Sequence, residues 1–111
     1  MKYLIVLLAS IFGSTVYASE VLDTKIAKMS INKEYGSFVF IKLETSAARI
    51  GCSTNGYWDY TLSIQTDAEK VMYSTLLSAY MAGKNVSIYG FSAPICDEFS
   101  SVESMAGFRV L

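Results

Sequence analysis

The chain has 111 residues, of which 9 are lysine or arginine and 10 are aspartate or glutamate, so its formal net charge is −1. A chain of this length forms one small domain, and so mild a charge argues against nucleic acid or another polyanion as its partner. The sequence contains no histidine, which excludes histidine-based triads and most general-base schemes. We therefore expect a protein that is not an enzyme and that uses no cofactor and no metal.

The first eighteen residues have the pattern of a cleavable signal peptide. Lys2 supplies a positive charge, residues 3–12 are apolar apart from one serine, and Val16 and Ala18 occupy the −3 and −1 positions that a signal peptidase reads. The apolar run has about half the roughly 20 residues that a membrane-spanning helix needs, so no stable membrane anchor is expected. We predict cleavage after Ala18, which would leave residues 19–111 as one exported domain in the periplasm or the extracellular medium.

Two cysteines, Cys52 and Cys96, are the only thiols in the chain. In an exported protein, two cysteines with none to spare indicate one disulfide. A zinc site would need three or four cysteine, histidine or carboxylate ligands, which this composition does not favour. A loop of 44 positions closed by this bridge would contribute about 4 kcal/mol of stability in the chain-entropy estimate.

The first two predicted strands are residues 26–31 and residues 37–43. The first is moderately apolar and ends at a polar turn closed by Gly36. The second, SFVFIKL, is dense in β-forming residues and is apolar on both faces at residues 38–41. We therefore expect this second strand to be central or to be covered on both sides.

The third predicted strand, residues 57–64, follows a hairpin signal. Asn55 and Gly56 both tolerate the positive φ angles that a tight hairpin turn requires. Beyond them the side chains alternate, so that one face carries Trp58, Tyr60, Leu62 and Ile64.

The period then changes to that of a helix. Thr66 and Glu69 form a capping box, which predicts a helix from Asp67 to about Ala82, and Gly83 has the position of its C′ residue. A further strand is predicted over residues 85–90, then a loop over residues 92–104 and a short last strand over residues 107–111.

Five strands with one helix between the third and the fourth have the order of a five-stranded OB-fold-like barrel, β-β-β-α-β-β. The alternative is an open α+β sheet with one helix on its face. In either case the predicted core contains the following residues: Trp58, Tyr60, Leu62, Ile64, Val71, Leu76, Ala79, Val86 and Ile88.

The helix has apolar residues on two sides. The stripe predicted to face the core consists of Ala68, Val71, Met72, Thr75, Leu76, Ala79 and Ala82. Opposite this stripe are Tyr73, Leu77, Tyr80 and Met81, which we expect to form an interface in an assembly. The alternative is that the loop of residues 92–104 folds over these four side chains.

The stretch YSTLLSAYMAGKNVSIYG, residues 73–90, resembles the helix-then-strand region of the B subunits of subtilase cytotoxin and typhoid-type toxins. Trp58 ahead of the helix, and a cysteine on either side of the helical region, are also similar. The resemblance implies an OB-fold that assembles into a ring and binds glycans on the flank of the barrel. No glycan-binding residue is carried over, because residues 19–31 contain no match to the serine-centred site of those toxins.

These observations predict an exported, non-enzymatic binding module that contacts a protein or a glycan and forms a homo-oligomer. Two alternatives remain open: a monomeric periplasmic protein with a structural or stress role, and a small hydrolase. A nucleic-acid partner is not expected, because the lysines are scattered among acidic residues.

Overall fold

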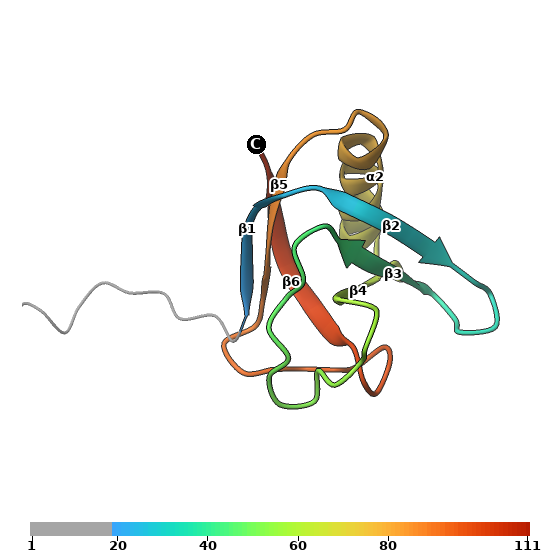
Figure 1. The fold of residues 1–111 in the computed structure, drawn as a ribbon. Coiled ribbons are helices and arrows are strands. Elements are labelled where there is room, and N and C mark those ends of the chain that lie inside the picture. Colours follow the sequence, from blue (N-terminus) through green and yellow to red (C-terminus); the bar gives the residue numbers. More distant parts are fainter. Residues whose placement is uncertain (1–18) are drawn as a thin grey trace, which may run out of the picture.

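The computed structural model describes residues 19–111, so the predicted signal peptide lies outside the described residues. These residues form a mostly β structure with one helix (Figure 1). The elements are β1 (Glu20–Thr24), β2 (Ile26–Ile31), β3 (Phe38–Leu43), β4 (Tyr60–Ser63), α2 (Asp67–Met81), β5 (Val86–Gly90) and β6 (Glu103–Val110). Hydrogen bonds join the strands into a single sheet in the order β1-β5-β6-β4-β3-β2.

The predicted fold class, mostly β with one helix, is confirmed. The prediction of five strands and the prediction of a closed barrel are not confirmed. The sheet has six strands and is open, with β1 at one end of the order and β2 at the other. The strand missing from the prediction is β1, whose short sequence, EVLDT, alternates poorly. Asp23 has a φ of 49°, a left-handed conformation that aspartate tolerates better than most residues. The chain changes direction there, so β1 pairs with β5 while β2 pairs with β3.

All strand pairs are antiparallel except β4 and β6, which run parallel. A parallel pair needs a long crossing connection, which α2 and β5 supply (Figure 1). β6 begins at Glu103 and is longer than predicted. Its first two residues, Glu103 and Ser104, fall in the loop predicted over residues 92–104, but both are strand residues and both are buried.

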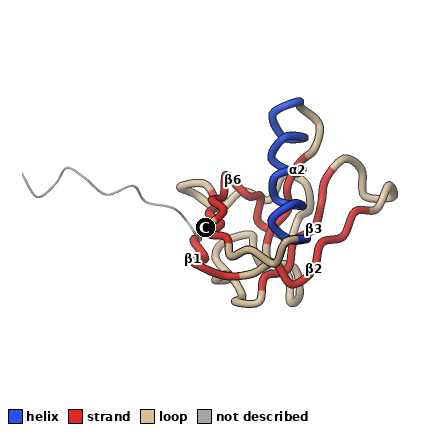
Figure 2. Tube along the Cα trace, turned by 90° about the horizontal axis from the view of Figure 1, so that it is seen from above, coloured by secondary structure: helices blue, strands red, loops and turns tan. Residues whose placement is uncertain are grey.

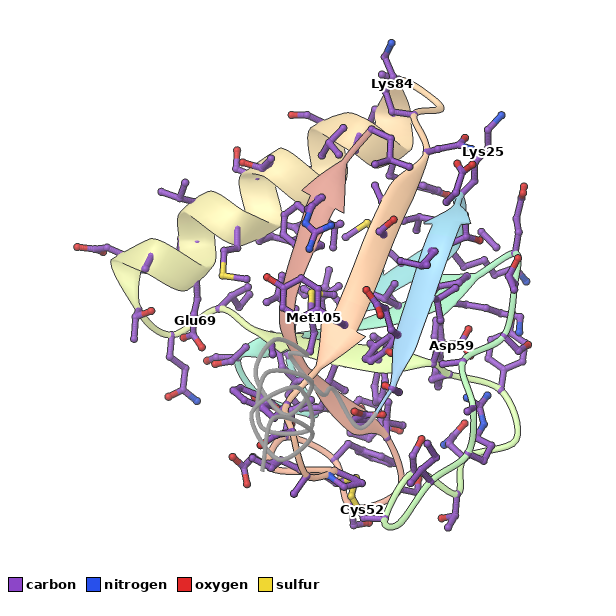
Figure 3. The ribbon with its side chains drawn as sticks, turned by 90° about the vertical axis from the view of Figure 1, so that its left-hand side faces the viewer. Lys25, Cys52, Asp59, Glu69, Lys84 and Met105 are labelled. Carbon is purple, nitrogen blue, oxygen red and sulfur yellow. A yellow bond between two sulfur atoms is a disulfide. The ribbon has the colours of Figure 1, made fainter. Side chains whose placement is uncertain are left out.

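The helix begins at the predicted capping box and ends just before the predicted C-terminal glycine. Thr66 Oγ1 accepts from the Glu69 N–H at 3.1 Å, and Glu69 Oε1 accepts from the Thr66 N–H at 3.0 Å. At the other end, Gly83 has a φ of 66°, and the Lys84 N–H donates to the Ala79 carbonyl at 2.9 Å. Glu69 and Lys84 mark the two ends of the helix in Figure 3.

The main core lies between the helix and the inner face of the sheet. It contains Val21, Ile26, Val39, Ile41, Leu43, Ala47, Tyr60, Leu62, Leu76, Ala79, Val86, Ile88 and Met105. Six of the nine predicted core residues belong to it, and Ile64 packs against it. The other two, Trp58 and Val71, were assigned to the wrong side.

Val71 is 65% exposed because the helix is rotated relative to the prediction. The buried side of the helix is centred on Leu76 and includes Tyr73 and Tyr80, which pack against the main core. The rotation amounts to roughly a quarter turn at 3.6 residues per turn. The side chains of the large tyrosines fill the space that the smaller residues of the predicted stripe would leave. Figure 2 shows the helix with β6 on one side and with β2 and β3 on the other.

The predicted hairpin at Asn55 and Gly56 does not form, since neither residue has a positive φ. Instead, Asn55 Oδ1 accepts from the Tyr57 N–H at 2.9 Å and from the Trp58 N–H at 2.8 Å. This turn occupies the residues that were predicted to begin the third strand. β4 therefore starts only at Tyr60, and the alternation that placed Trp58 in the main core does not extend back to it.

Candidate functional site

A cluster of five aromatic side chains lies on the outer face of β3. The aromatic cluster consists of Tyr35, Phe38, Phe40, Trp58 and Phe99. Phe40 is central: its ring centroid lies 5.7 Å from that of Tyr35, 5.2 Å from that of Trp58 and 5.1 Å from those of Phe38 and Phe99. The contact with Trp58 is stacked, whereas the other three are edge-to-face, both favourable geometries for aromatic pairs.

The alternation of β3 explains why the cluster forms there. Val39 and Ile41 point into the main core, so Phe38 and Phe40 point to the opposite face. This confirms the prediction that the strand is covered on both sides. Phe38 and Phe40 are each only 5% exposed, but Tyr35 at the rim is 51% exposed. The cluster therefore has a buried inner layer and an accessible outer layer.

Tyr57 extends the accessible layer beside Trp58. Its ring lies edge-on to the indole, with the centroids 4.9 Å apart, and its side chain is 39% exposed. The Lys42 Nζ lies 4.5 Å from the Tyr57 centroid and the Lys28 Nζ lies 5.5 Å from it. A hydrogen bond with Tyr57 raises the pKa of Lys28 above its ordinary value. Two cationic donors and a phenol thus stand next to the aromatic surface.

A buried aspartate holds the connection from β3 to the cluster. Asp59 is fully buried, and its carboxylate accepts from the Leu43 N–H at 2.8 Å and the Ala47 N–H at 2.9 Å. The Arg49 guanidinium donates to the same carboxylate at 3.0 Å and to the Asn55 carbonyl at 2.7 Å. A buried carboxylate is stable only when paired and hydrogen-bonded. This network therefore determines the path of the chain that carries Tyr57 and Trp58.

The disulfide joins this connection to the loop that carries Phe99. Cys52 and Cys96 are bonded, with a Cα–Cα distance of 6.2 Å, so the predicted bridge is confirmed. The Thr54 and Asn55 N–H groups also donate to the Ser101 carbonyl, at 3.0 and 2.9 Å. The two loops lie together at the bottom of the molecule in Figure 1, and Cys52 is labelled there in Figure 3. The aromatic cluster is thus framed by two covalently linked loops.

Glu98 anchors the second loop to the sheet. Its carboxylate accepts from the Thr61 hydroxyl at 3.1 Å and from the Ser104 hydroxyl. Ser104 Oγ in turn accepts from the Asp97 N–H at 3.0 Å. Both hydroxyls belong to residues of paired strands, β4 and β6, so the position of Phe99 is coupled to the sheet itself.

The predicted interface on the helix is divided by the rotation described above. Tyr73 and Tyr80 are half-buried and pack against the main core. Leu77 is half-buried, and Met81 is 77% exposed. The loop of residues 92–104, which the alternative placed over these side chains, instead contributes Phe99 to the aromatic cluster.

A separate open groove of about 410 Å³ lies between the helix and strands β5 and β6. Its walls are Val71, Met72 and Thr75 from α2, Tyr89 from β5, and Ala106, Gly107, Phe108 and Val110 from β6. Val71 and Val110 are 65% and 43% exposed. Most of the lining residues are apolar, and Thr75 and Tyr89 are the polar ones.

A small polar cluster is buried where β1 meets β5 and β6. Ser19 Oγ lies 2.5 Å from the Tyr60 hydroxyl and donates to Glu103 Oε1 at 2.8 Å. Burial raises the pKa of Tyr60 to about 12 and also raises that of Glu103. Both groups are therefore less acidic than in water.

Sequence reasoning found the disulfide but not the aromatic cluster. The signal was present in the alternation of Phe38 and Phe40 with Val39 and Ile41, which indicated two apolar faces. The partners of the outer face, however, come from three separate connections, and no local pattern brings these together.

Within residues 19–111, no group of three histidine, cysteine, aspartate or glutamate side chains lies close enough together to hold a metal ion. No helix of this part of the chain is long and apolar enough to cross a membrane. Comparison of the chain with models of protein families, with curated proteins and with solved structures finds no significant match.

Proposed function

We propose that this chain is an exported, non-enzymatic binding module with an OB-like architecture, and that it binds a glycan on the accessible layer of the aromatic cluster. The observation that carries the proposal is the position of Tyr35, Tyr57 and Trp58, three aromatic side chains that are partly exposed above a buried aromatic base. The Cys52–Cys96 bridge supports export, because disulfides persist in oxidising compartments.

The strand order supports the OB-like assignment. β1 and β2 are separated only by Lys25, so they correspond to the two halves of one bent strand. These halves lie at opposite ends of the strand order of the sheet. With that count there are five strands, the helix falls between the third and the fourth, and the third pairs in parallel with the fifth. OB-folds bind oligosaccharides and oligonucleotides on the face of their second and third strands, between the first and the last interstrand loops. The aromatic cluster occupies the corresponding place.

The chemistry of the surface supports a sugar as the ligand. Binding sites combine apolar and aromatic walls with a few placed polar groups, and tyrosine and tryptophan present a large apolar face beside a polar tip. The Lys28 and Lys42 ammonium groups and the Tyr57 hydroxyl supply hydrogen-bonding groups at the rim. An oligonucleotide is less suited to this surface, because acidic residues outnumber basic ones in residues 19–111.

The test is a screen of the mature chain, residues 19–111, against an array of immobilised oligosaccharides, followed by titration with the strongest binder. Trp58 is the only tryptophan, so its fluorescence reports directly on this site. We expect saturable binding with a change in Trp58 emission. Tyr35→Ala should weaken that binding by about tenfold or more, consistent with the loss of one aromatic contact.

Val71→Ser is the matched control, since Val71 lines the separate groove beside the helix and belongs to no part of the aromatic cluster. It should leave binding unchanged. Failure of every oligosaccharide to bind, or equal losses in Tyr35→Ala and Val71→Ser, would contradict the proposed site.

A second candidate function is assembly through the helix, as the resemblance implies. Met81 favours it, because it is the most exposed large apolar side chain of the helix at 77%, next to the half-buried Leu77. Met81→Asp should then convert an oligomer to a monomer on a sizing column, without loss of secondary structure. A wild-type chain that elutes as a monomer would instead support the monomeric alternative.

A further inference from the structure

The Glu103 carboxylate is buried with one oxygen unpaired. The residue is fully buried on β6, and its Oε1 accepts from the Ser19 hydroxyl at 2.8 Å. Within residues 19–111, its Oε2 has no hydrogen-bond partner. An isolated buried carboxylate is strongly unfavourable, and such groups are normally paired with a cation or kept neutral.

Ser19 lies beside this carboxylate and contacts its other oxygen. Its carbonyl accepts from the Gly90 N–H at 3.0 Å, which aligns it with β5 just before β1 begins. A Cβ placed on Gly90 would lie 1.8 Å from Glu103 Oε2 and 3.2 Å from Ser19 Oγ. Oε2 therefore lies close against the Gly90 backbone, on the side where the Ser19 side chain also lies.

We propose that the α-ammonium group of Ser19, formed when the signal peptide is removed, binds the buried Glu103 carboxylate. Hydrolysis consumes one water molecule and breaks the Ala18–Ser19 peptide bond. The new carboxylate leaves with residues 1–18, and the new amino group stays on Ser19 and is protonated.

Covalent geometry supports this pairing. The backbone nitrogen of Ser19 is three bonds from its Oγ, so it lies within about 3–4 Å of that atom. Since Oγ donates to Glu103 Oε1 at 2.8 Å, the nitrogen lies within about 7 Å of that oxygen, near enough for the freed N-terminus to reach the carboxylate by a rotation of the Ser19 backbone. An ammonium group carries a positive charge and three donors, whereas the amide that it replaces carries no charge and one donor. Of the two groups, only the ammonium carries a charge that can offset that of the Glu103 carboxylate.

Among the described residues, the other polar groups around this site provide no cation. The Tyr60 hydroxyl lies 2.5 Å from Ser19 Oγ, and the charged groups that act on Tyr60 are Glu103, Asp59 and Glu20, all acidic. Asp59 is already paired with Arg49. The new N-terminus is thus the cation that this part of the fold lacks, and the fold would reach its full stability only after the signal peptide is removed.

The inference rests on cleavage after Ala18 and not on glycan binding, so either can fail while the other holds. Its test compares two chains in urea-induced unfolding, one that begins at Ser19 and one that retains Ala18 as an additional residue. Each is prepared with and without the Glu103→Gln substitution. A single extra residue moves the ammonium group by about 3.8 Å along the chain, out of contact with the carboxylate.

We expect the additional residue to lower the folding equilibrium constant by about tenfold or more when Glu103 is present, as for a lost hydrogen bond to a charged group. In the Glu103→Gln background the same extension should have no effect. Equal losses in both backgrounds, or no loss in either, would overturn the proposal.

A second measurement does not depend on a stable variant. The chain that begins at Ser19 is treated with acetic anhydride in its folded state, and peptide mapping quantifies acetylation of the α-amine. We expect strong protection relative to the urea-unfolded chain, while exposed lysines such as Lys33 react fully. An α-amine that reacts as fast as Lys33 would contradict the pairing.

Discussion

The indole of Trp58 stacks on the ring of Phe40, with the centroids 5.2 Å apart and the planes inclined by 25°. Trp58 belongs to the turn before β4 and Phe40 to the outer face of β3, so the contact joins a connection to the sheet. Because Trp58 remains half-exposed while Phe40 is buried, one ring supports the other in a position that a ligand can reach.

The layered arrangement predicts different costs for substitutions in the cluster. Phe40→Ala should lower the free energy of unfolding by about 3–5 kcal/mol, as for other buried aromatic residues. Tyr35→Ala should cost only about 1 kcal/mol, because half of that side chain is already in water. Urea-induced unfolding of both variants measures the difference. Equal costs would show that the inner and outer layers are not distinct.

Removal of the disulfide should destabilise the domain by about 4 kcal/mol, because the bridge closes a loop with a sequence separation of 44. A variant with serine at both Cys52 and Cys96 is compared with the oxidised protein in equilibrium unfolding. Reduction of the wild-type protein provides the control and should give a loss of similar size. A change below about 1 kcal/mol would indicate that the unfolded chain gains little freedom when the bridge is absent.

Asp59→Asn should cost about 2–3 kcal/mol. The substitution places an amide donor opposite the backbone N–H of Leu43 or Ala47, both of which donate to the carboxylate in the native protein. Arg49→Met should cost less, because the Arg49 side chain is 29% exposed and solvent weakens its ion pair. Thermal unfolding of the two variants establishes the order, and a larger cost for Arg49→Met would contradict this assignment.

Glu69 should make the helix sensitive to acid. The hydrogen bond from the Thr66 backbone N–H, and further bonds from neighbouring groups, lower the pKa of Glu69 below its ordinary value of 4.5. The folded state therefore favours the charged form, and this stability is present above pH 4.5 and lost as the pH falls through the lowered folded-state pKa. The difference in unfolding free energy between the wild type and Glu69→Gln should shrink by a few tenths of a kcal/mol between pH 6 and pH 3, since the group is near the surface. A difference that does not depend on pH would contradict this.

Gly90→Ala should destabilise the domain by about 2 kcal/mol or more, because the added methyl group would meet Glu103 Oε2 at 1.8 Å. Combining it with Glu103→Ala should cost less than the sum of the two single substitutions, since the obstructing carboxylate is gone. Gly56→Ala is the control, because nothing lies within 4 Å of the position of its added Cβ. If the double variant lost as much stability as the sum of the two single variants, the clash between the added methyl group and Glu103 would not be the cause of the Gly90→Ala loss.

Local chemistry was enough to predict several elements of this protein. The capping box of Thr66 and Glu69 and the glycine at position 83 set the helix boundaries through bonds within a few residues. The two cysteines allowed only one pairing within the chain, and it formed. Dense β-forming residues likewise located β3 and β5. In each case the determining interaction joins residues that are close in the sequence, or no alternative pairing exists.

Contacts between distant segments decided the rest. Which side of α2 is buried depends on the strands that meet Leu76, Tyr73 and Tyr80, since both sides of the helix are apolar. β1 is a strand only because β5 pairs with it. Ser19 and Glu103 are 84 positions apart, and the sequence placed neither of them in a strand or in the core. Only the packing of β1 against β5 and β6 brings them together in the interior, because burial is a property of the assembled sheet and not of a local pattern of residues.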